Sequence, residues 1–391
     1  MRSILVSAAI LAAAFSVFAV TPADAQVTMR VRMPAVMPAD SPVYVAGSFN
    51  GWNPGDPGSR LAEGANGEYT ITLPETVRGP IEFKFTLGVW ERVEVDSAGA
   101  SIPNRRFVVP ATGAATWRGT VAGWQDPGKI PARKSTRRPT VTVLDTAFPI
   151  PQLHRTRRVW VYLPPDYASS SKRYPVLYMH DGQNVFDDST SGFGEWGVDE
   201  TLDSLFATGD PGVIVVAVDH GGAKRLDEYS PFINPRHGGG EGDAYVDFLA
   251  QTLKPLIDRR YRTRPDRLNT GVAGSSMGGL ISLYAGLRYP EVFGRVGVFS
   301  PALWFSPAIF SYATAADPGR PRPRFYFVTG AQEGVAPEVY VRDQGRMVET
   351  LAALGFRSGT ELSAAVRPDG QHAEWFWRRE FPAAYQWLFG G

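Results

Sequence analysis

The chain has 391 residues, of which 43% are hydrophobic, and its formal net charge at pH 7 is +1. This length predicts about two packed domains, and the near-zero charge gives no electrostatic reason to expect nucleic acid or an anionic membrane surface as a partner. The sequence contains no cysteine, which excludes thiol nucleophiles, thiolate metal sites and disulfides.

The first 25 residues have the features of a cleavable export signal. A charge at Arg2 precedes an apolar stretch from Ile4 to Val20, and Ala23 and Ala25 are the small residues before the predicted cut. A membrane anchor is the alternative, but 17 apolar residues are few for a span. No later segment is long and apolar enough to cross a bilayer. We therefore expect a soluble mature protein in the periplasm or outside the cell.

Residues 26–125 read as short strands separated by turns. The stretches "GEYTITLPE" and "IEFKFTLGVWERVEV" alternate strictly between apolar and polar residues, as half-buried antiparallel strands do. We predict a small all-β sandwich here. Residues 126–140 are basic, contain proline and have no periodic apolar pattern, which indicates a linker. They could instead pack along the second domain.

From residue 141 to residue 391 the pattern changes to buried strands alternating with helices. The strands are the continuous apolar runs "YPVLYMH", "GVIVVAVD", "NTGVAG", "GRVGVFS" and "RFYFVTG". Such runs suit strands buried on both faces of a mostly parallel sheet, and helical patterns between them predict an α/β fold. One helix, "DAYVDFLAQTLKPLIDRRY", is expected to begin at an N-cap formed by Asp243.

Ser276 is the candidate nucleophile, because it lies in a G-x-S-x-G pattern between a strand and a helix. Gly274 and Gly278 flank it at two residues on either side. A strand that turns abruptly into a helix strains its turn residue, and larger neighbours would collide there. The alternative is an ordinary glycine-rich bend, but the required context, a strand before and a helix after, is present.

His372 is the candidate general base. Of the five histidines it alone follows Ser276, and hydrolases of this architecture run in the order serine, acid, histidine. A capping or surface histidine is the alternative. The other four are His154, His180, His220 and His237.

Glu333 is the candidate acid, because it follows the strand "RFYFVTG" between the serine and the histidine. A carboxylate there could hold the imidazole tautomer and stabilise the imidazolium ion. Asp343 and Asp369 are rivals, although Asp369 is so near His372 that it could serve only to shape the turn.

The oxyanion hole is expected to use the backbone amides of Met277 and Gln183. Met277 directly follows the nucleophile, and Gln183 follows the early strand, in "HDGQN". Gly182 beside it is expected to let the chain approach the substrate closely. The string "HGGGEGD" from His237 imitates a lipase motif but follows a later strand, so we interpret it as a mobile loop on the substrate side.

With these residues assembled, residues 141 to 389 resemble the putative-esterase family of α/β-hydrolases. That family includes enterochelin esterase-like enzymes, feruloyl and acetyl-xylan esterases, and mycolyltransferases. The matching strings include "YPVLYMHDGQNVFDD", "AGSSMGGLISLYAGLRYPEVFG", "VTGAQEG" and "DGQHAEWFW". The resemblance implies serine hydrolase roles for Ser276, Glu333 and His372, with no metal or cofactor. Where relatives often have histidine before the serine, this chain has Ser275.

Arg225 and Glu228 also match a family string, "RLDEY". We interpret them as structural ion-pair residues in preference to substrate contacts.

The first domain is similar to early-set, immunoglobulin-like modules that bind starch and glycogen. The strings that carry this likeness are "VYVAGSFNGWNP", "IEFKFTLGVWERVEVD" and "IPNRRF". Trp52 and Trp90 could stack on a sugar ring, with Lys84 near them in the pattern. Alternatively, Trp52 packs within the fold, and esterases of the enterochelin type have a similar domain that binds no polysaccharide.

These observations predict a secreted serine esterase that forms an acyl-enzyme. Its substrate would be a feruloyl or acetyl ester on a glycan, or a siderophore ester. The alternatives are a glycan-binding protein with an inert hydrolase domain and an acyltransferase of the mycolyl-transferring type. Several aromatic residues could line the pocket or pack in the core: Trp196, Trp304, Phe305, Trp375 and Phe376.

Overall fold

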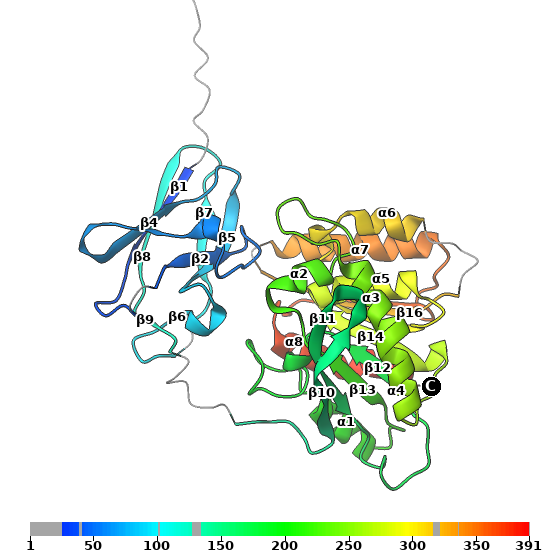
Figure 1. Ribbon diagram of the computed structural model, residues 1–391. Helices are drawn as coiled ribbons and strands as arrows, with labels where there is room; N and C mark the ends of the chain where they lie inside the picture. The colour runs from blue at the N-terminus through cyan, green and yellow to red at the C-terminus, as the bar shows by residue number, and fades with distance from the viewer. Residues whose placement is uncertain are drawn as a thin grey trace, which may run out of the picture.

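The computed structural model describes residues 26–38, 41–100, 102–126, 134–315, 321–334 and 336–390. The predicted export signal therefore lies outside the described residues. An all-β part at the N-terminal side and a larger α/β part are seen side by side in Figure 1.

The all-β part consists of short strands in three small sheets, with the orders β3-β4-β1-β8, β2-β5-β7 and β6-β9. Phe83 and Phe85 of β5 are fully buried and pack with Met29 and Val45 in a core separate from those of the α/β part. The sheet β2-β5-β7 lies on the side that faces the α/β part (Figure 1). The strands are β1 (Gln26–Arg32), β2 (Tyr44–Gly47), β3 (Ala62–Glu63), β4 (Glu68–Thr72), β5 (Gly79–Thr86), β6 (Glu94–Val95), β7 (Arg105–Val109), β8 (Ala114–Thr120) and β9 (Gly123–Trp124).

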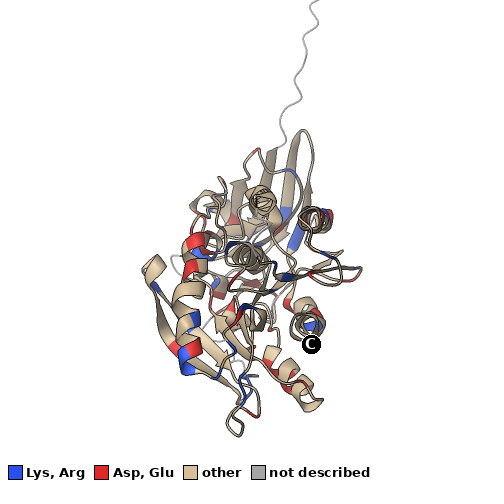
Figure 2. Ribbon diagram, turned by 90° about the vertical axis from the view of Figure 1, so that its right-hand side faces the viewer, with Lys and Arg blue, Asp and Glu red and all other residues tan. Residues whose placement is uncertain are grey.

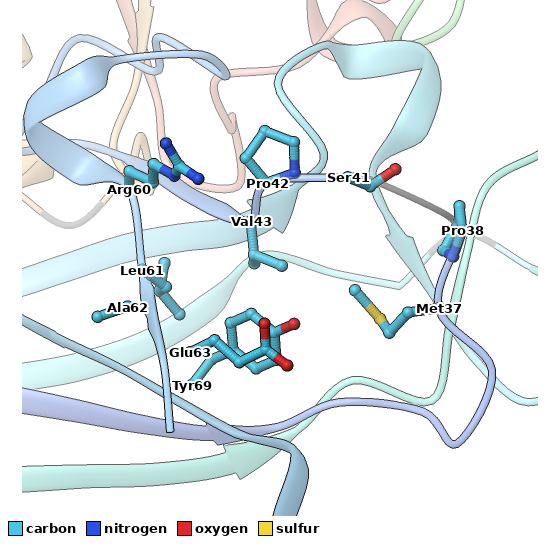
Figure 3. A pocket seen from close by; sticks show the side chains of 10 residues that line it. All are labelled: Met37, Pro38, Ser41, Pro42, Val43, Arg60, Leu61, Ala62, Glu63 and Tyr69. Atoms are coloured by element: carbon cyan, nitrogen blue, oxygen red, sulfur yellow. The ribbon is translucent and has the colours of Figure 1, made fainter. Parts of the chain in front are cut away.

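A pocket of about 800 Å³ opens in this all-β part (Figure 3). It is lined by Met37, Pro38, Ser41, Pro42, Val43, Arg60, Leu61, Ala62, Glu63 and Tyr69. None of the residues predicted to act in catalysis or to stack on sugar belongs to this lining, so the pocket is a feature of the module alone.

The α/β part is built on one sheet with the order β10-β11-β13-β12-β14-β15-β16-β17. Strands β12 to β17 run parallel, whereas β10 and β11 form an antiparallel edge. The predicted mostly parallel sheet is thereby confirmed. The strands are β10 (Val141–Ile150), β11 (Arg155–Tyr162), β12 (Val176–Met179), β13 (Ile214–Val218), β14 (Thr270–Ser275), β15 (Arg295–Phe299), β16 (Arg324–Gly330) and β17 (Leu362–Arg367).

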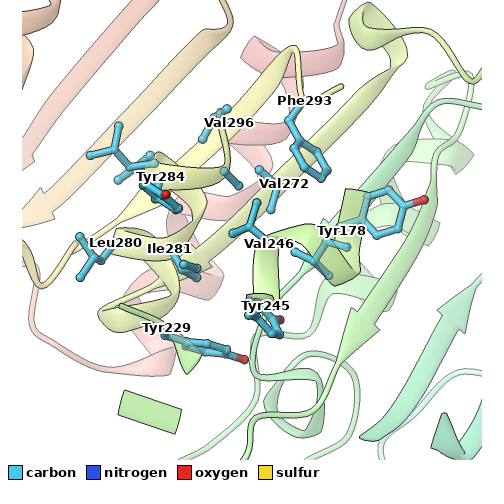
Figure 4. Packing of buried hydrophobic residues seen from close by; sticks show 14 of the residues in the cluster. Tyr178, Tyr229, Tyr245, Val246, Val272, Leu280, Ile281, Tyr284, Phe293 and Val296 are labelled. Atoms are coloured by element: carbon cyan, nitrogen blue, oxygen red, sulfur yellow. The ribbon is translucent and has the colours of Figure 1, made fainter. Parts of the chain in front are cut away.

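Helices cover both faces of this sheet, which explains why its central strands are apolar on both sides. Buried side chains of α3, α5, α6 and α7 form one core with one face, and those of α1 and α8 form a second core with the other. Figure 4 shows Tyr229 and Tyr245 close to Leu280 and Ile281 in the first core. The helices are α1 (Val198–Ala207), α2 (Arg225–Glu228), α3 (Gly242–Asp247), α4 (Lys254–Arg260), α5 (Met277–Arg288), α6 (Ala308–Thr314), α7 (Pro337–Ala353) and α8 (Glu374–Phe389).

The predicted N-cap at Asp243 is wrong. Helix α3 begins at Gly242 with Glu241 at the N-cap position, and a π-helical segment, Phe248–Leu253, joins α3 to α4. The Asp243 carboxylate instead accepts a hydrogen bond from the Tyr284 hydroxyl of α5. A tertiary contact thus occupies the side chain that the local pattern assigned to capping.

The described part of the predicted linker packs along the α/β part. Ser135 Oγ donates to Asp187 Oδ2 over 2.7 Å, and Thr136 Oγ1 donates to Glu195 Oε2 over 2.9 Å. Both acceptors lie in the loop between β12 and α1. This contact settles the alternative that the sequence left open for residues 134–140.

Acidic and basic residues are interspersed along the helices of the α/β part (Figure 2), in keeping with the net charge of +1. Among the described residues, no helix combines the length and the apolar character that a membrane crossing would need.

Candidate active site

The predicted catalytic residues all follow the carboxyl ends of neighbouring parallel strands. Ser276 comes after β14, Glu333 after β16 and His372 after β17, and only β15 separates β14 from β16 in the sheet. Open α/β sheets place their ligand sites at this edge. The sheet topology therefore brings the three residues to one place, although nearly 100 positions separate the first from the last in the sequence.

Ser276 has a strained backbone at the turn from β14 into α5. Its φ is 57° and its ψ is −120°, in a region that non-glycine residues rarely adopt. A Cβ on Gly274 would lie 2.9 Å from the His180 ring and 3.0 Å from the backbone of Gly278. Larger residues at this point would collide, so the turn requires glycine for the steric reason that the sequence suggested.

Glu333 and His372 are joined directly. His372 Nδ1 lies 2.9 Å from Glu333 Oε2, and the Glu333 side chain is fully buried. Because an ionised carboxylate only accepts hydrogen bonds, this contact places the imidazole proton on Nδ1 and leaves Nε2 as the acceptor. Neither rival acid takes this place, because Asp343 pairs with Arg342 and Asp369 pairs with Arg379.

Ser300 is a residue of the candidate site that the sequence reasoning missed. It follows β15 with a φ of 42°, donates from Oγ to Glu333 Oε1 over 2.5 Å, and accepts from Trp377 Nε1 over 2.9 Å. The Gly330 amide donates to the same Glu333 oxygen over 2.6 Å. The only sequence signal that could have indicated Ser300 was its position after β15, the strand between those of Ser276 and Glu333.

The loops that carry Glu333 and His372 cross at two glycines. A Cβ on Gly330 would lie 2.2 Å from the carbonyl carbon of Gly370, and one on Gly370 would lie 2.6 Å from the Gly330 Cα. The Gln332 amide also donates to the Gly370 carbonyl over 2.9 Å. This backbone contact holds the acid and the base at a fixed separation.

The two amides predicted for the oxyanion hole follow adjacent strands of the sheet. Met277 is the first residue of α5, and Gln183 lies in the 3₁₀ turn Gly182–Asn184 after β12, which pairs with β14. Neither amide donates a hydrogen bond to another described residue. The first amides of a helix point outward and favour negative charge. Gly182 serves packing, since a Cβ there would lie 2.8 Å from the Val218 backbone.

An ion pair and two tyrosines hold the turn after β12. Arg225 Nε donates to Asp181 Oδ1 over 2.6 Å, and its second nitrogen donates to Oδ2 over 2.8 Å. Burial opposes ionisation of Asp181, but Arg225 outweighs it and lowers the pKa of this carboxyl. The Asp181 amide donates to the Tyr229 hydroxyl over 3.1 Å, and the Tyr245 hydroxyl lies 2.9 Å from His180 Nδ1.

Glu228, the other residue of the predicted ion-pair string, does not pair with Arg225. It is fully buried, and its carboxylate is bound by Arg155 over 2.8 Å and by Arg157. Both members of the string thus take part in ion pairs, each with a different partner.

Glu374 is a buried carboxyl group two residues after His372. Burial raises its pKa to about 8. Asn184 Nδ2 approaches its Oε1 at 3.4 Å, which links the first turn of α8 to the turn that contains Gln183.

The aromatic residues considered for the pocket fall into two groups, one buried and one exposed. Trp196, Phe305 and Phe376 are buried in the cores and do not line an open site. Trp304 and Trp375 are 38% and 45% exposed. Trp304 Nε1 donates to the Tyr340 hydroxyl over 3.2 Å, and the Tyr340 ring lies 5.0 Å from that of His372, so Trp304 lies close to the candidate base.

The residues predicted to stack on sugar lie together in the all-β part. The ring centroids of Trp52 and Trp90 are 6.2 Å apart, and both side chains are half-buried. Lys84 Nζ donates to the Ile102 carbonyl over 2.7 Å, and burial lowers the pKa of this ammonium group.

The loop that begins at His237 is held in place by hydrogen bonds. The Gly239 amide donates to Asp227 Oδ1 over 2.8 Å, and the Gly240 amide donates to the Ser230 carbonyl over 2.8 Å. Such anchoring does not match the mobile loop expected from the glycine run.

Among the described residues, no group of three or more potential ligands could hold a metal ion.

Comparison with known proteins decides the family. The family model described as "Putative esterase" matches residues 150–388, which is more than half of the chain. The chain belongs to the Putative esterase family. Its α/β part is that of a carboxylic ester hydrolase, as the sequence resemblance implied.

Three curated relatives match different shares of the chain. YbbA of Bacillus subtilis is 27% identical over 246 residues, which are 60% of this chain and 93% of the relative. An endo-1,4-beta-xylanase/feruloyl esterase of Xylanibacter ruminicola is 28% identical over 59% of this chain and 29% of its own length. An alpha-amylase of Niallia circulans is 46% identical over 100 residues, which are 26% of this chain and 8% of the relative. The chain therefore spans less than a third of the last two relatives.

A solved structure shares the fold over most of the chain. The enterobactin esterase of Shigella flexneri aligns with a TM-score of 0.51 at 17% identity, over 89% of this chain and 88% of its own.

Replacing Gly330 by alanine tests whether the glycine crossing sets the distance between acid and base. Because the added methyl group would collide with the Gly370 backbone, we expect Gly330→Ala to lower kcat/KM for p-nitrophenyl acetate at least tenfold and to destabilise the protein by about 2 kcal/mol. Steady-state kinetics and urea unfolding measure the two effects.

Gly345→Ala is the matched control. Gly345 lies in α7, and a Cβ there meets nothing within 4 Å. This change should leave activity intact and stabilise the protein by up to about 1 kcal/mol. Full activity of Gly330→Ala would contradict the role given to the crossing.

Proposed function

We propose that this protein is an exported serine esterase. Ser276 is the nucleophile, His372 the general base and Glu333 the acid that orients the base, while the amides of Met277 and Gln183 bind the oxyanion. The reaction class follows from family membership, and the roles of the individual residues are our assignment.

One observation carries the proposal. A strained serine between a strand and a helix lies at the same sheet edge as a histidine bonded to a buried carboxylate over 2.9 Å. A serine hydroxyl is a weak nucleophile unless a base removes its proton, and the base in turn needs a group that fixes its tautomer. Glu333 supplies that group. Its carboxylate is itself held in place, because its other oxygen accepts hydrogen bonds from Ser300 and from the Gly330 amide.

The chemistry then proceeds in two steps. Ser276 Oγ attacks the ester carbonyl carbon while its proton moves to His372 Nε2, and the carbonyl oxygen becomes an anion between the two amides. His372 returns the proton to the departing alcohol, which leaves an acyl group on Ser276. A water molecule, deprotonated by His372, attacks that acyl group, releases the acid and restores the serine.

For the substrate we propose an acyl group, feruloyl or acetyl, carried on a glycan. One relative is named a xylanase/feruloyl esterase, and another is named an alpha-amylase. The half-buried pair Trp52 and Trp90 offers flat rings to the apolar face of a sugar. A siderophore ester is the second candidate, because the structural neighbour from Shigella flexneri is named an enterobactin esterase.

Replacing Ser276 by alanine tests the assignment of the nucleophile. Since the hydroxyl that forms the acyl-enzyme would be gone, we expect hydrolysis of p-nitrophenyl acetate to fall by at least a thousandfold, in line with losses in other serine hydrolases. Ser275→Ala, which removes the neighbouring hydroxyl, is the matched control and should keep most of the activity. A folded Ser276→Ala protein with wild-type turnover would refute the proposal.

Export is proposed from the sequence of residues 1–25 alone. When the full chain is expressed in a bacterial host, we expect the protein in the periplasm or medium to begin at Gln26. N-terminal sequencing measures this. Recovery of an intact Met1 terminus in the cytoplasm would contradict export.

A further inference from the structure

Aromatic rings connect the all-β part with the α/β part. The Trp52 and Trp90 rings are 6.2 Å apart, and the Trp90 ring lies 6.3 Å from that of Phe193, in the loop between β12 and α1. Phe193 is 70% exposed. These three rings, which we call the aromatic track, therefore begin in the module and end on the catalytic part.

The loop that carries Phe193 is part of the framework of the candidate oxyanion hole. Thr190 Oγ1 donates to the Gln183 carbonyl over 2.7 Å. Gly194, directly after Phe193, lies against Glu374 at the start of α8, with 3.7 Å between the Cβ position of the glycine and the Cβ of the glutamate. The end of the aromatic track is thus fixed to the two segments that carry Gln183 and His372.

A second contact between the two parts involves the segment just before Trp52. A Cβ on Gly51, the residue before Trp52, would lie 3.1 Å from His237 Nδ1. The His237 ring is 6.2 Å from that of Trp304, which reaches His372 through Tyr340.

The two contacts set the module beside the catalytic edge of the sheet. We propose that Trp52, Trp90 and Phe193 form one sugar-binding surface continuous with the catalytic site, and that the substrate is an ester carried on a chain of several sugar units. The inference rests on the proposed esterase function. Flat rings in series, of which Phe193 is exposed and Trp52 and Trp90 are half-buried, suit the apolar faces of successive sugars. A surface beside the sheet edge that carries Ser276 suits a substrate whose ester and sugars belong to one molecule.

Chain-length dependence tests this inference. The probes are acetylated and feruloylated xylo- and malto-oligosaccharides of increasing length, with p-nitrophenyl acetate as the small reference ester. In the wild-type protein we expect kcat/KM to rise with chain length in at least one series. In Trp90→Ala and in Phe193→Ala, the ratio of kcat/KM for the longest ester to that for p-nitrophenyl acetate should fall about tenfold, as expected for the loss of one stacking ring.

Trp387→Ala is the matched control. Trp387 is a half-buried tryptophan that stacks on Arg324 at the start of β16, at the opposite edge of the sheet from Ser276. It should keep the wild-type ratio. Circular dichroism and thermal melting confirm that each variant is folded.

The outcomes separate this inference from the proposed function. If no series shows a rise with chain length, or if the rise survives unchanged in both track variants, the inference is wrong. In either case, if p-nitrophenyl acetate hydrolysis depends on Ser276, the proposed esterase function is still supported. If wild-type hydrolysis does not depend on Ser276, the proposed function fails first.

Discussion

The geometry of the site depends on the hydrogen bonds that the buried carboxylate of Glu333 accepts. This carboxylate accepts hydrogen bonds from Ser300 after β15, from the amide of Gly330 at the end of β16, and from His372 after β17. A buried carboxylate without these partners would carry a large desolvation cost. Satisfying it therefore draws three successive strand ends together and orients the imidazole beside the end of β14.

Three of the six described non-glycine residues with a positive φ lie at the same edge. Asp181, Ser276 and Ser300 follow β12, β14 and β15, and all three have positive φ angles although none is glycine. Each is held by its surroundings: Asp181 by Arg225, Ser300 by Glu333 and Trp377, and Ser276 by backbone bonds to Phe299 and Ala302. Such strain persists only where packing over-determines it, and it gathers at functional sites.

The sequence predicted the parts of this arrangement that follow local rules. The apolar runs gave the parallel strands, and chain order selected Ser276, Glu333 and His372, which the structure places at one sheet edge. The Ser300 contact and the crossing of Gly330 and Gly370 depend on loops that meet only after the sheet has formed. No local pattern encodes them.

Other features escaped prediction because tertiary contacts overrode local signals. Asp243 resembles an N-cap, but its carboxylate is taken by Tyr284. The aromatic residues near the site could not be divided into core and surface by type, because Trp196 and Trp304 differ in burial and not in chemistry. The contact of Trp90 with Phe193 joins two parts of the chain whose patterns are unrelated.

Labelling with a fluorophosphonate probe tests the central claim, that Ser276 is activated by His372 and Glu333. The wild-type protein, His372→Ala and Glu333→Gln would be treated with the probe, and the modified peptide identified by mass spectrometry. We predict labelling at Ser276 in the wild-type protein, with a rate that falls at least a hundredfold in His372→Ala and less in Glu333→Gln. Labelling of a different residue, or an unchanged rate in His372→Ala, would contradict the account.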